Sequence, residues 1–573
     1  DQGWGDLGCY GAEGFGTPHL DRLAAQGMRF TDFYASQAVC SASRASLLTG
    51  CYAERVSVRG AYSPTSQVGL HPEEETIADL LRRRGYVTAC VGKWHLGSRP
   101  EFLPGRQGFD EYFGLPYSND MWPLDYLGHP VEKGRKARHP ALPLLEGERV
   151  VDRVEDLADQ DRLTTRYTER AVDFIERHRE RPFFLYLAHS MVHVPLGVSP
   201  RFRGKSGQGM FGDVMMEVDW SVGRVMAALE RCGLARDTLV VYASDNGPWL
   251  NFGDHAGSAG PLREGKGTAF EGGPRVPCIM RWPGRIAPGG VCRRMASTLD
   301  ILPTLVAATG APAPARKIDG VSLLPLLEGR PGADPRREFW FYYGGQLRAV
   351  RQGKWKRVFR HRTRSYEGVE PGRDGRPGNY AHPTVPAALY DLERDIGERH
   401  DVSAEHPEVV ARLEALAERA RRELGDRLTG RRGEEVRPPG RARFARPDRV
   451  AHLAVGAKVT LRRKPAPRYR GGGARSLTDG RRGSRDWRDG NWLGFRGKVV
   501  EGTLDLGAAK RVRQVTVGGY ELQGAWAFPP RALEVETSSD GRRWQPGGRA
   551  EVEVAKRRGA RAVPVTVTLP GGE

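Results

Sequence analysis

Long apolar runs that alternate with amphipathic segments restrict most strongly how this chain folds. Continuous apolar stretches occupy residues 86–91, 182–190 and 237–247, and such runs are typical of strands buried on both faces of a sheet. Helical spacing of apolar residues precedes the first run, from Thr17-Pro18 onward and again over residues 73–84. Because helices and strands alternate, the sequence predicts an α/β fold with a mostly parallel central sheet.

The rest of the chain has a different pattern. After about residue 310 the apolar runs become shorter, and an amphipathic helix is predicted over residues 407–424. A segment rich in Arg, Gly and Pro then reads as a linker, and short alternating strands between Gly-rich turns follow it. We therefore predict an α/β domain over residues 1–310, an α+β subdomain over 311–425, a linker over 426–448 and a β-sandwich over 449–573.

The chain is strongly basic, with 89 Lys and Arg against 70 Asp and Glu and a formal net charge of +19. Such a field attracts polyanions, including sulfated or phosphorylated substrates, although a solvated basic surface explains the same charge. The sequence has no basic helix, zinc-finger spacing or aromatic RNA-binding signature, so no nucleic-acid partner is predicted. It also has no long uncharged apolar run, and we predict a soluble multi-domain protein without a membrane span.

Polar clusters of the first region follow predicted strands or begin a helix. Cys40 stands at the predicted start of a helix that contains Leu47 and Leu48, where free N–H groups and the helix dipole stabilise negative charge. Taken singly, each cluster has a structural interpretation: a buried thiol, surface charges, or a tight turn built from Asp, Asn and Gly. The four clusters contribute Cys40 with Arg44, Lys93 with His95, Asp245 with Asn246, and Lys266. His193, which follows the apolar run over residues 182–190, completes the set.

The clusters gain meaning in combination. Transfer of an anionic group requires cationic clamps, a metal, a nucleophile and a proton donor that arrive from separate strand ends. In chain order, GDLGCYG, CSASR followed by LLTG, GKWHLG, SDNGP and GKGTAFEGG resemble the signature and flanking blocks of the type I sulfatases, in particular the arylsulfatase A and N-acetylgalactosamine-6-sulfatase group. The resemblance covers roughly residues 1–425 and implies the alkaline-phosphatase-like sulfatase fold.

The resemblance implies a nucleophile and a metal. Cys40 would be oxidised to formylglycine by a formylglycine-generating maturation enzyme, and Ala42 stands where the signature more often has Pro. A hydrated aldehyde offers two hydroxyl groups on one carbon, so that one attacks sulfur and the other expels sulfate and regenerates the aldehyde. The implied metal is Ca²⁺ or Mg²⁺, held by Asp1, Asp245, Asn246 and the modified Cys40.

The other matched residues are implied to handle sulfate and protons. Lys93 and Arg44 would hold the modified side chain, and His95 would take the proton of its second hydroxyl group. Side chains implied to bind sulfate oxygens or to assist the leaving alcohol are Lys93, His193 and Lys266, with Ser118 near the sulfate.

Both ends of the chain are interpreted as truncated. The family has two adjacent aspartates after an apolar first strand, and this chain begins at the residue that matches the second of them, Asp1. The C-terminal β region resembles the galactose-binding, discoidin-like sandwiches of glycosidases and stops within what we interpret as an incomplete module. Its candidate sugar-stacking residues are Trp487, Trp492 and Trp526, although a small β core explains each equally well.

We therefore predict a sulfuric ester hydrolase that acts on sulfated carbohydrate in the periplasm or outside the cell. One alternative is a phosphomonoesterase or phosphodiesterase of the same superfamily, and another is a non-catalytic glycan-binding relic. The CSASR block argues against the first, because such phosphatases commonly present an unmodified Thr or Ser nucleophile. The set of basic and acidic site residues argues against the second.

Overall fold

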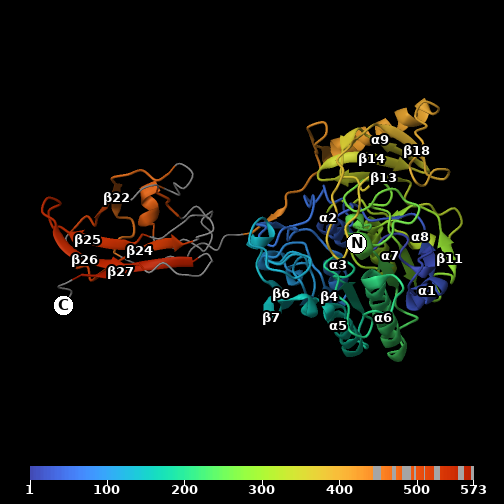
Figure 1. Ribbon diagram of the computed structural model, residues 1–573, viewed down its shortest axis with the longest axis horizontal. Coiled ribbons are helices and arrows are strands. Elements are labelled where there is room, and N and C mark those ends of the chain that lie inside the picture. The colour runs from blue at the N-terminus through green and yellow to red at the C-terminus, as the bar shows by residue number, and fades with distance from the viewer. Residues whose placement is uncertain are drawn as a thin grey trace. The chain divides into compact units, whose positions relative to one another are not determined.

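The structure, a computed structural model, describes residues 1–442, 453–466, 473–479, 492–495, 499–508, 510–521, 530–552 and 561–569. The chain divides into two compact units, Asp1–Ala442 and Arg443–Glu573 (Figure 1). All candidate catalytic and metal-binding residues belong to the first unit. Among the described residues, no helix has the length and apolar character needed to cross a membrane.

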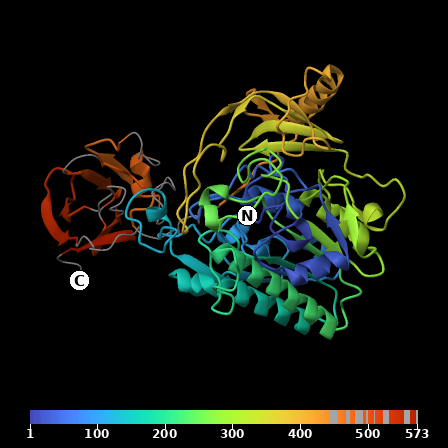
Figure 2. The same ribbon diagram turned by 45° about the vertical axis from the view of Figure 1, so that its right-hand side comes forward.

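Two sheets lie at the centre of the first unit. One has the strand order β7-β6-β5-β4-β8, formed by β4 (Val87–Gly92), β5 (Glu111–Gly114), β6 (Leu142–Glu146), β7 (Arg149–Val154) and β8 (Phe183–Ala188). The other has the order β11-β1-β10-β9, formed by β1 (Met28–Phe30), β9 (Val240–Ala243), β10 (Cys278–Arg281) and β11 (Gly290–Cys292). Helices α5 (Leu163–Arg177) and α6 (Gly209–Arg231) pack side by side along these sheets (Figure 2).

Strand pairing is mixed in direction rather than mostly parallel. β4 pairs parallel with β5 and β8, as predicted, and β1 pairs parallel with β11. β6 and β7 instead form an antiparallel hairpin across the turn Gly147-Glu148, in which Gly147 adopts a φ of 58°, and β10 runs antiparallel to both β1 and β9. A two-residue turn joins only antiparallel strands, so the α/β class is confirmed while the sheets as a whole are mixed.

The helices begin where local signals place them. α1 (Pro18–Ala25) and α9 (Pro407–Leu424) start at proline, whose fixed φ suits the first helical turn, and both match the prediction. α3 (Ile77–Arg83) is shorter than the predicted 73–84, because the Thr76 hydroxyl accepts from Asp79 N and the Asp79 carboxylate accepts from Thr76 N, which caps the helix at this point. Other helices of the first unit are α2 (Cys40–Thr49), α4 (Leu157–Asp161), α7 (Ile301–Thr309) and α8 (Leu324–Leu327).

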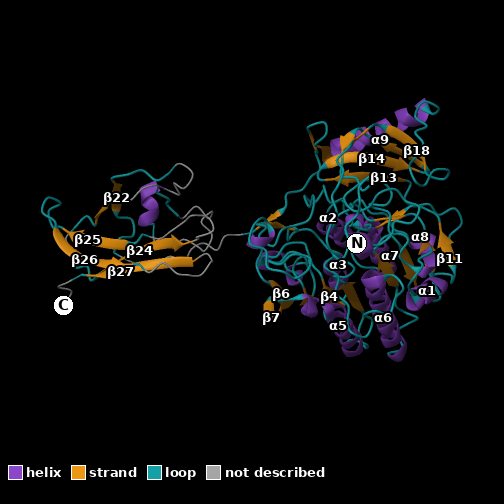
Figure 3. Cartoon of the chain, in the orientation of Figure 1, coloured by secondary structure: helices purple, strands orange, loops and turns teal. Residues whose placement is uncertain are grey.

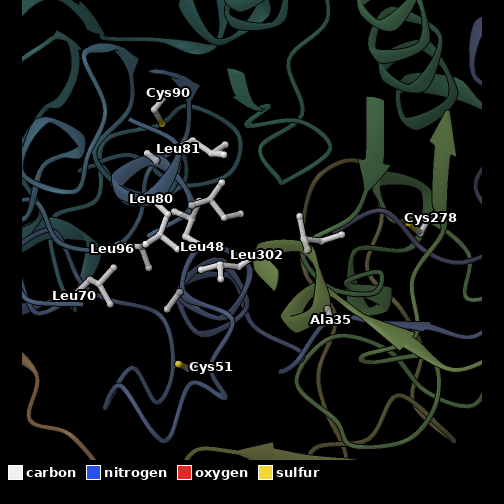
Figure 4. Close-up of a cluster of buried hydrophobic side chains, with 14 of the residues drawn as sticks. Ala35, Leu48, Cys51, Leu70, Leu80, Leu81, Cys90, Leu96, Cys278 and Leu302 are labelled. Carbon is white, nitrogen blue, oxygen red and sulfur yellow. The ribbon is translucent and has the colours of Figure 1, made fainter. Parts of the chain in front are cut away.

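A hydrophobic core packs α2 against both sheets. Leu48 of α2, Leu80 of α3 and Leu302 of α7 are fully buried in one cluster (Figure 4). Cys90 of β4 and Cys278 of β10 belong to the same cluster. Burying one leucine side chain contributes about 1.5–3 kcal/mol, so these contacts fix the axis of α2 and the position of its first residue.

Another sheet completes the first unit. It has the antiparallel order β13-β14-β15-β18, formed by β13 (Glu338–Tyr343), β14 (Gln346–Gln352), β15 (Trp355–Val358) and β18 (Ala388–Asp391). α9 lies over one face of it (Figure 1) and buries Val409, Leu413, Leu416, Ala417, Ala420 and Leu424. Short strand pairs join β2 (Phe33–Tyr34) to β12 (Ala296–Ser297), β16 (His361–Arg362) to β17 (Thr384–Val385), and β19 (Gly425–Asp426) to β20 (Arg431–Arg432).

The predicted linker over residues 426–448 is part of the first unit as far as residue 442. β21 (Gly440–Arg441) pairs antiparallel with β3 (Val68–Gly69), and the Arg437 guanidinium donates to the two carboxylate oxygens of Glu74 at 2.9 and 2.7 Å. Arg437 is one of the arginines on which the linker prediction depended, and it binds the first unit. Residues 443–448 lie outside the described residues.

Where it is described, the second unit consists mainly of antiparallel strand pairs (Figure 3). These pairs are β22 (Lys458–Leu461) with β23 (Gly502–Asp505), β24 (Gln514–Glu521) with β27 (Arg561–Thr568), and β25 (Ala532–Thr537) with β26 (Gln545–Glu551). Trp487 and Trp526 lie outside the described residues, and Trp492 is half-buried. The β-sandwich arrangement of this unit stays a prediction.

Glu54 is a buried carboxyl group that makes the stability of the first unit depend on pH. It is 1% exposed and accepts a hydrogen bond from Gln37 Nε2 at 2.9 Å. Burial raises its pKa from 4.5 to about 7. Between these values the folded chain keeps a proton that the unfolded chain has released, so the stability that this group contributes falls as the pH rises through this window.

The substitution E54Q keeps an acceptor oxygen and removes the charge. We expect it to raise the free energy of unfolding by up to about 3 kcal/mol at pH 8 and to change it little at pH 4. Thermal or urea unfolding of both chains at the two pH values measures the difference. An equal change at both values would contradict the assignment of the pH dependence to Glu54.

Candidate active site

Cys40 is the first residue of α2, as the sequence predicts. The preceding Val39 has an extended backbone, with φ −158° and ψ 140°, and the thiol is 3% exposed and packs with Val39, Ala42 and Ala53. The N–H groups of a first helical turn have no partner within the helix, and the helix dipole adds partial positive charge there. Negative charge that develops on a group at position 40 is therefore stabilised.

Arg44 lies one turn after Cys40 in α2 and connects this helix with residues that follow two strands. Its Nε and Nη2 donate to Asp245 Oδ2 at 3.1 and 2.9 Å, and its Nη1 donates to the backbone oxygen of Lys93 at 2.6 Å. Asp245 follows β9 and Lys93 follows β4, so one guanidinium ties α2 to strands of both sheets. The fold therefore brings these predicted site residues together.

Asp1, Asn246 and Lys266 form the adjoining half of the site. Lys266 Nζ donates to the Asp1 carboxylate oxygens at 2.7 and 2.8 Å, and Asn246 Nδ2 donates to Asp1 Oδ1 at 2.8 Å. The backbone nitrogen of Asp1 lies 3.0 Å from Asp245 Oδ1. This contact connects the two halves into one cluster.

The donors around Asp245 fit a divalent metal ion chemically. Although burial opposes it, the surrounding positive charges, those of Arg44, Lys93 and Lys266 among them, hold the pKa of the Asp245 carboxyl well below its usual range. Asn246 Oδ1 is buried without a hydrogen-bond partner, and the Asp1 carboxylate already holds a cation, the Lys266 ammonium. Two carboxylates and an unpaired amide oxygen are the hard donors that Ca²⁺ and Mg²⁺ prefer. In the described part of the chain no three His, Cys, Asp or Glu side chains are grouped to hold a metal, so a metal here depends on the amide oxygen.

Lys93 and His95 follow β4 and are buried. Lys93 is 1% exposed, and burial lowers the pKa of its ammonium group. His95 adopts a left-handed backbone with φ 62°, and its Nε2 lies 3.0 Å from the backbone oxygen of Tyr62. Its Nδ1 is buried without a partner, and burial, with the nearby Lys93, holds its pKa well below the usual value. His95 is therefore a neutral imidazole with one unpaired ring nitrogen.

His193 and Ser118 meet beside Asp1. His193 Nε2 lies 3.8 Å from Asp1 Oδ2 and 3.5 Å from Ser118 Oγ. An N–H at Nδ1 donates to the backbone oxygen of Val194 at 2.6 Å, which leaves Nε2 available to the site. Burial and the Lys266 ammonium hold the pKa of His193 well below its usual value.

Two aromatic side chains belong to this cluster although the sequence analysis did not single them out. The Trp249 ring lies 4.3 Å from Lys266 Nζ and 5.4 Å from the His193 ring. The Tyr186 hydroxyl lies 3.4 Å from Arg44 Nη1. Trp249 directly follows the SDNGP motif, which was a usable signal, whereas Tyr186 lies within the apolar strand β8 and has no such motif beside it.

Family models, curated relatives and a solved structure point to sulfatases. The Sulfatase family model matches residues 1–311, and the model for the C-terminal region of aryl-sulfatase matches residues 334–437. Human arylsulfatase A is 42% identical over 437 residues, which cover 73% of this chain and 85% of that protein. Human N-acetylgalactosamine-6-sulfatase is 38% identical over 448 residues, which cover 73% and 83%. The crystal structure of PsFucS1 sulfatase from Pseudoalteromonas sp. is similar with a TM-score of 0.65 and 27% identity, covering 73% of this chain and 88% of that chain.

Proposed function

This chain belongs to the sulfatase family, and we propose that it hydrolyses sulfate esters of carbohydrates at the site around Cys40. The observation that carries the proposal is a set of buried cations: Arg44, Lys93 and Lys266 are 6%, 1% and 5% exposed. Cations held away from water stabilise the charge of a sulfate group strongly. The name of N-acetylgalactosamine-6-sulfatase supports a sulfated sugar as the substrate.

The nucleophile in this proposal is formylglycine, made from Cys40 by a maturation enzyme. Membership of the sulfatase family implies this modification together with a divalent metal. Once formed and hydrated, the aldehyde supplies one hydroxyl group that attacks sulfur and a second whose deprotonation releases sulfate. The first position of α2 places this carbon beside the unpaired N–H groups of the helix.

The proposed metal is Ca²⁺ or Mg²⁺, held by Asp1, Asp245, Asn246 and the modified Cys40. When bound, such an ion supplies Lewis-acid polarisation of oxygen atoms. The protein orients the donors: Arg44 fixes the Asp245 carboxylate with two hydrogen bonds, and Asn246 Nδ2 fixes Asp1. Arg44 thereby acts on the metal donors as well as on the nucleophile.

The remaining side chains handle protons and sulfate oxygens. His95, neutral and with an unpaired Nδ1, accepts the proton of the second hydroxyl group, while Lys93 stabilises the modified side chain. An anionic sulfate beside His193 favours the protonated imidazole, whose Nε2–H then donates to a sulfate oxygen or to the leaving alcohol. Lys266 binds sulfate oxygens, and Ser118 holds the His193 ring.

The proposal extends to the other parts of the chain. We assign residues 1–310 to the catalytic domain and 311–425 to its C-terminal subdomain, with a carbohydrate-binding, discoidin-like sandwich from residue 449. The antiparallel strand pairs of the second unit support such a module. A glycan of polymer size is met outside the cytoplasm, so we propose a periplasmic or extracellular location.

Hydrolysis in ¹⁸O-labelled water tests the proposed reaction. Full-length protein coexpressed with a maturation enzyme is given N-acetylgalactosamine 6-sulfate and, separately, the matching 6-phosphate. We expect sulfate that carries solvent oxygen and an unlabelled sugar, because attack occurs at sulfur, with the phosphate ester hydrolysed at least about 100-fold more slowly. Faster phosphate release would instead establish the phosphatase alternative, and sugar binding without any turnover would establish the non-catalytic one.

A further inference from the structure

One segment of the C-terminal subdomain reaches the catalytic cluster. Residues 359–385 extend from the sheet of β13-β14-β15-β18, and Figure 2 shows this yellow segment descending from it. The Tyr366 hydroxyl donates to the backbone oxygen of Lys266 at 2.5 Å, and Trp249 Nε1 donates to the Tyr380 hydroxyl. Because the Trp249 ring contacts the Lys266 ammonium, this segment forms a wall of the sulfate site.

Arg364 lies on this wall directly beside the Lys266 loop. A Cβ atom added to Gly267 would meet Arg364 Cζ and Nε at 2.9 Å, so the guanidinium packs against the residue that follows Lys266. Arg364 Cζ also lies 4.8 Å from the centre of the Tyr380 ring. The side chain is half-buried, so part of it remains accessible to solvent beside the Lys266 loop.

Arg364 has no carboxylate partner within salt-bridge distance in the part of the chain that the structure describes. The acidic side chains of the same region are engaged elsewhere. Glu264 accepts from the Ser365 hydroxyl and from Tyr366 N, and Glu367 pairs with Arg263 and Arg399. The Arg364 guanidinium contacts the Tyr366 hydroxyl and the Tyr380 ring, both neutral, so no anion among the described residues balances its charge.

A second arginine strengthens the positive field at the same place. Arg348 is 7% exposed, donates to Thr363 Oγ1 and Gln346 Oε1 at 3.0 Å, and stacks 4.8 Å from the Tyr343 ring. Burial lowers its pKa to about 10, and repulsion from Arg364 adds to this shift. Tyr343 in turn packs against the small cluster that contains Cys40. Neither arginine has an acidic partner among the described residues; Arg364 contacts the Lys266 loop, and Arg348 contacts Tyr343, which packs against the Cys40 cluster.

We propose that Arg364, supported by Arg348, forms a second anion subsite. It binds a carboxylate or a second sulfate group carried by the sugar whose scissile sulfate lies at Lys266. The planar fork of a guanidinium matches both groups with paired hydrogen bonds. This inference rests on the proposed function and narrows its substrate to sugars with more than one anionic group.

The test compares substrates that differ by one anionic group. The probes are N-acetylgalactosamine 6-sulfate, the same sugar linked to glucuronate, and N-acetylgalactosamine 4,6-disulfate. In R364Q we expect KM to rise about 10- to 100-fold for at least one of the two doubly charged sugars, with kcat retained and with the singly charged sugar unchanged. The probe that responds identifies the bound group as carboxylate or sulfate. R364K keeps the charge without the fork and should lie between wild type and R364Q.

The matched control is R412Q. It removes one exposed positive charge from α9 in the same subdomain, so it reports any effect of net charge alone and should leave all three KM values unchanged. Equal changes for all three sugars in R364Q, or none, would overturn the subsite.

A binding measurement separates this inference from the proposed function. Calorimetric titration of the same sugars into C40A and into C40A with R364Q requires no turnover, and the doubly charged sugar should bind about 10- to 100-fold more weakly to the second chain. If wild type hydrolyses no sulfate ester but this difference persists, the proposed function fails and the subsite stands. If wild type is active and the difference is absent, only the subsite fails.

Discussion

Replacing Cys40 by alanine is expected to lower kcat by at least about 10⁴-fold while the chain stays folded. The reason is that the proposed nucleophile is made from this residue, and removal of a covalent nucleophile from an otherwise intact site typically leaves only the contribution of binding and electrostatics. Cys40 packs with small side chains, and loss of one sulfur atom there leaves a small cavity, so the melting temperature should change little. Turnover of a sulfated sugar and thermal unfolding measure the two parts of this prediction.

The matched control for C40A is C232S. Cys232 is a half-buried thiol at the C-terminal end of α6, and its replacement should leave kcat within about twofold of wild type. If C40A retained most of its activity, the nucleophile would lie elsewhere and the assignment of the site would be wrong.

Replacing Asp245 by asparagine is expected to lower kcat/KM by about 10³-fold and to raise the concentration of Ca²⁺ or Mg²⁺ needed for half-maximal activity. The substitution is nearly isosteric and removes one negative charge from the proposed metal donors. It also removes the carboxylate that Arg44 binds through Nε and Nη2. Titration of the metal-free protein with each ion, followed by activity and by calorimetry, measures both effects.

The control for D245N is D237N. Asp237 is exposed and precedes β9, the strand that Asp245 follows, so its replacement changes the charge equally at the far end of the same strand. It should leave the metal requirement unchanged. A loss of activity in D245N without any change in metal affinity would assign Asp245 to orientation of Arg44 alone.

The central residues of the site stand beside local structural signals, but their roles followed only from the resemblance of the ordered blocks to the sulfatases. Cys40 begins a helix, Lys93 follows an apolar strand, and Asp245 follows another. In a parallel α/β sheet the carboxyl ends of the strands lie at a common edge, which made a meeting of these residues the expectation, although β4 and β9 belong to different sheets. The structure confirms this meeting through the contacts of Arg44.

Other features depend on packing between distant segments, which local patterns do not encode. Arg364 and Tyr380 reach the site from an antiparallel subdomain about 100 residues beyond Lys266, and nothing in their own neighbourhood marks them. The antiparallel direction of β10 could not be predicted either. The apolar residues of a buried strand carry no signal for the direction in which it pairs. The segment 426–442 was misassigned because arginine-rich composition is shared by linkers and by surfaces that form ion pairs.

Mass spectrometry of tryptic peptide 30–44 tests the central claim most directly, because this peptide carries Cys40 and no internal Lys or Arg. The protein is coexpressed with a formylglycine-generating enzyme, and the same preparation is assayed for release of inorganic sulfate from a sulfated sugar. We predict that the thiol is replaced by an aldehyde and that activity rises with the aldehyde fraction. An unmodified thiol in protein that hydrolyses the ester at full rate would contradict the account.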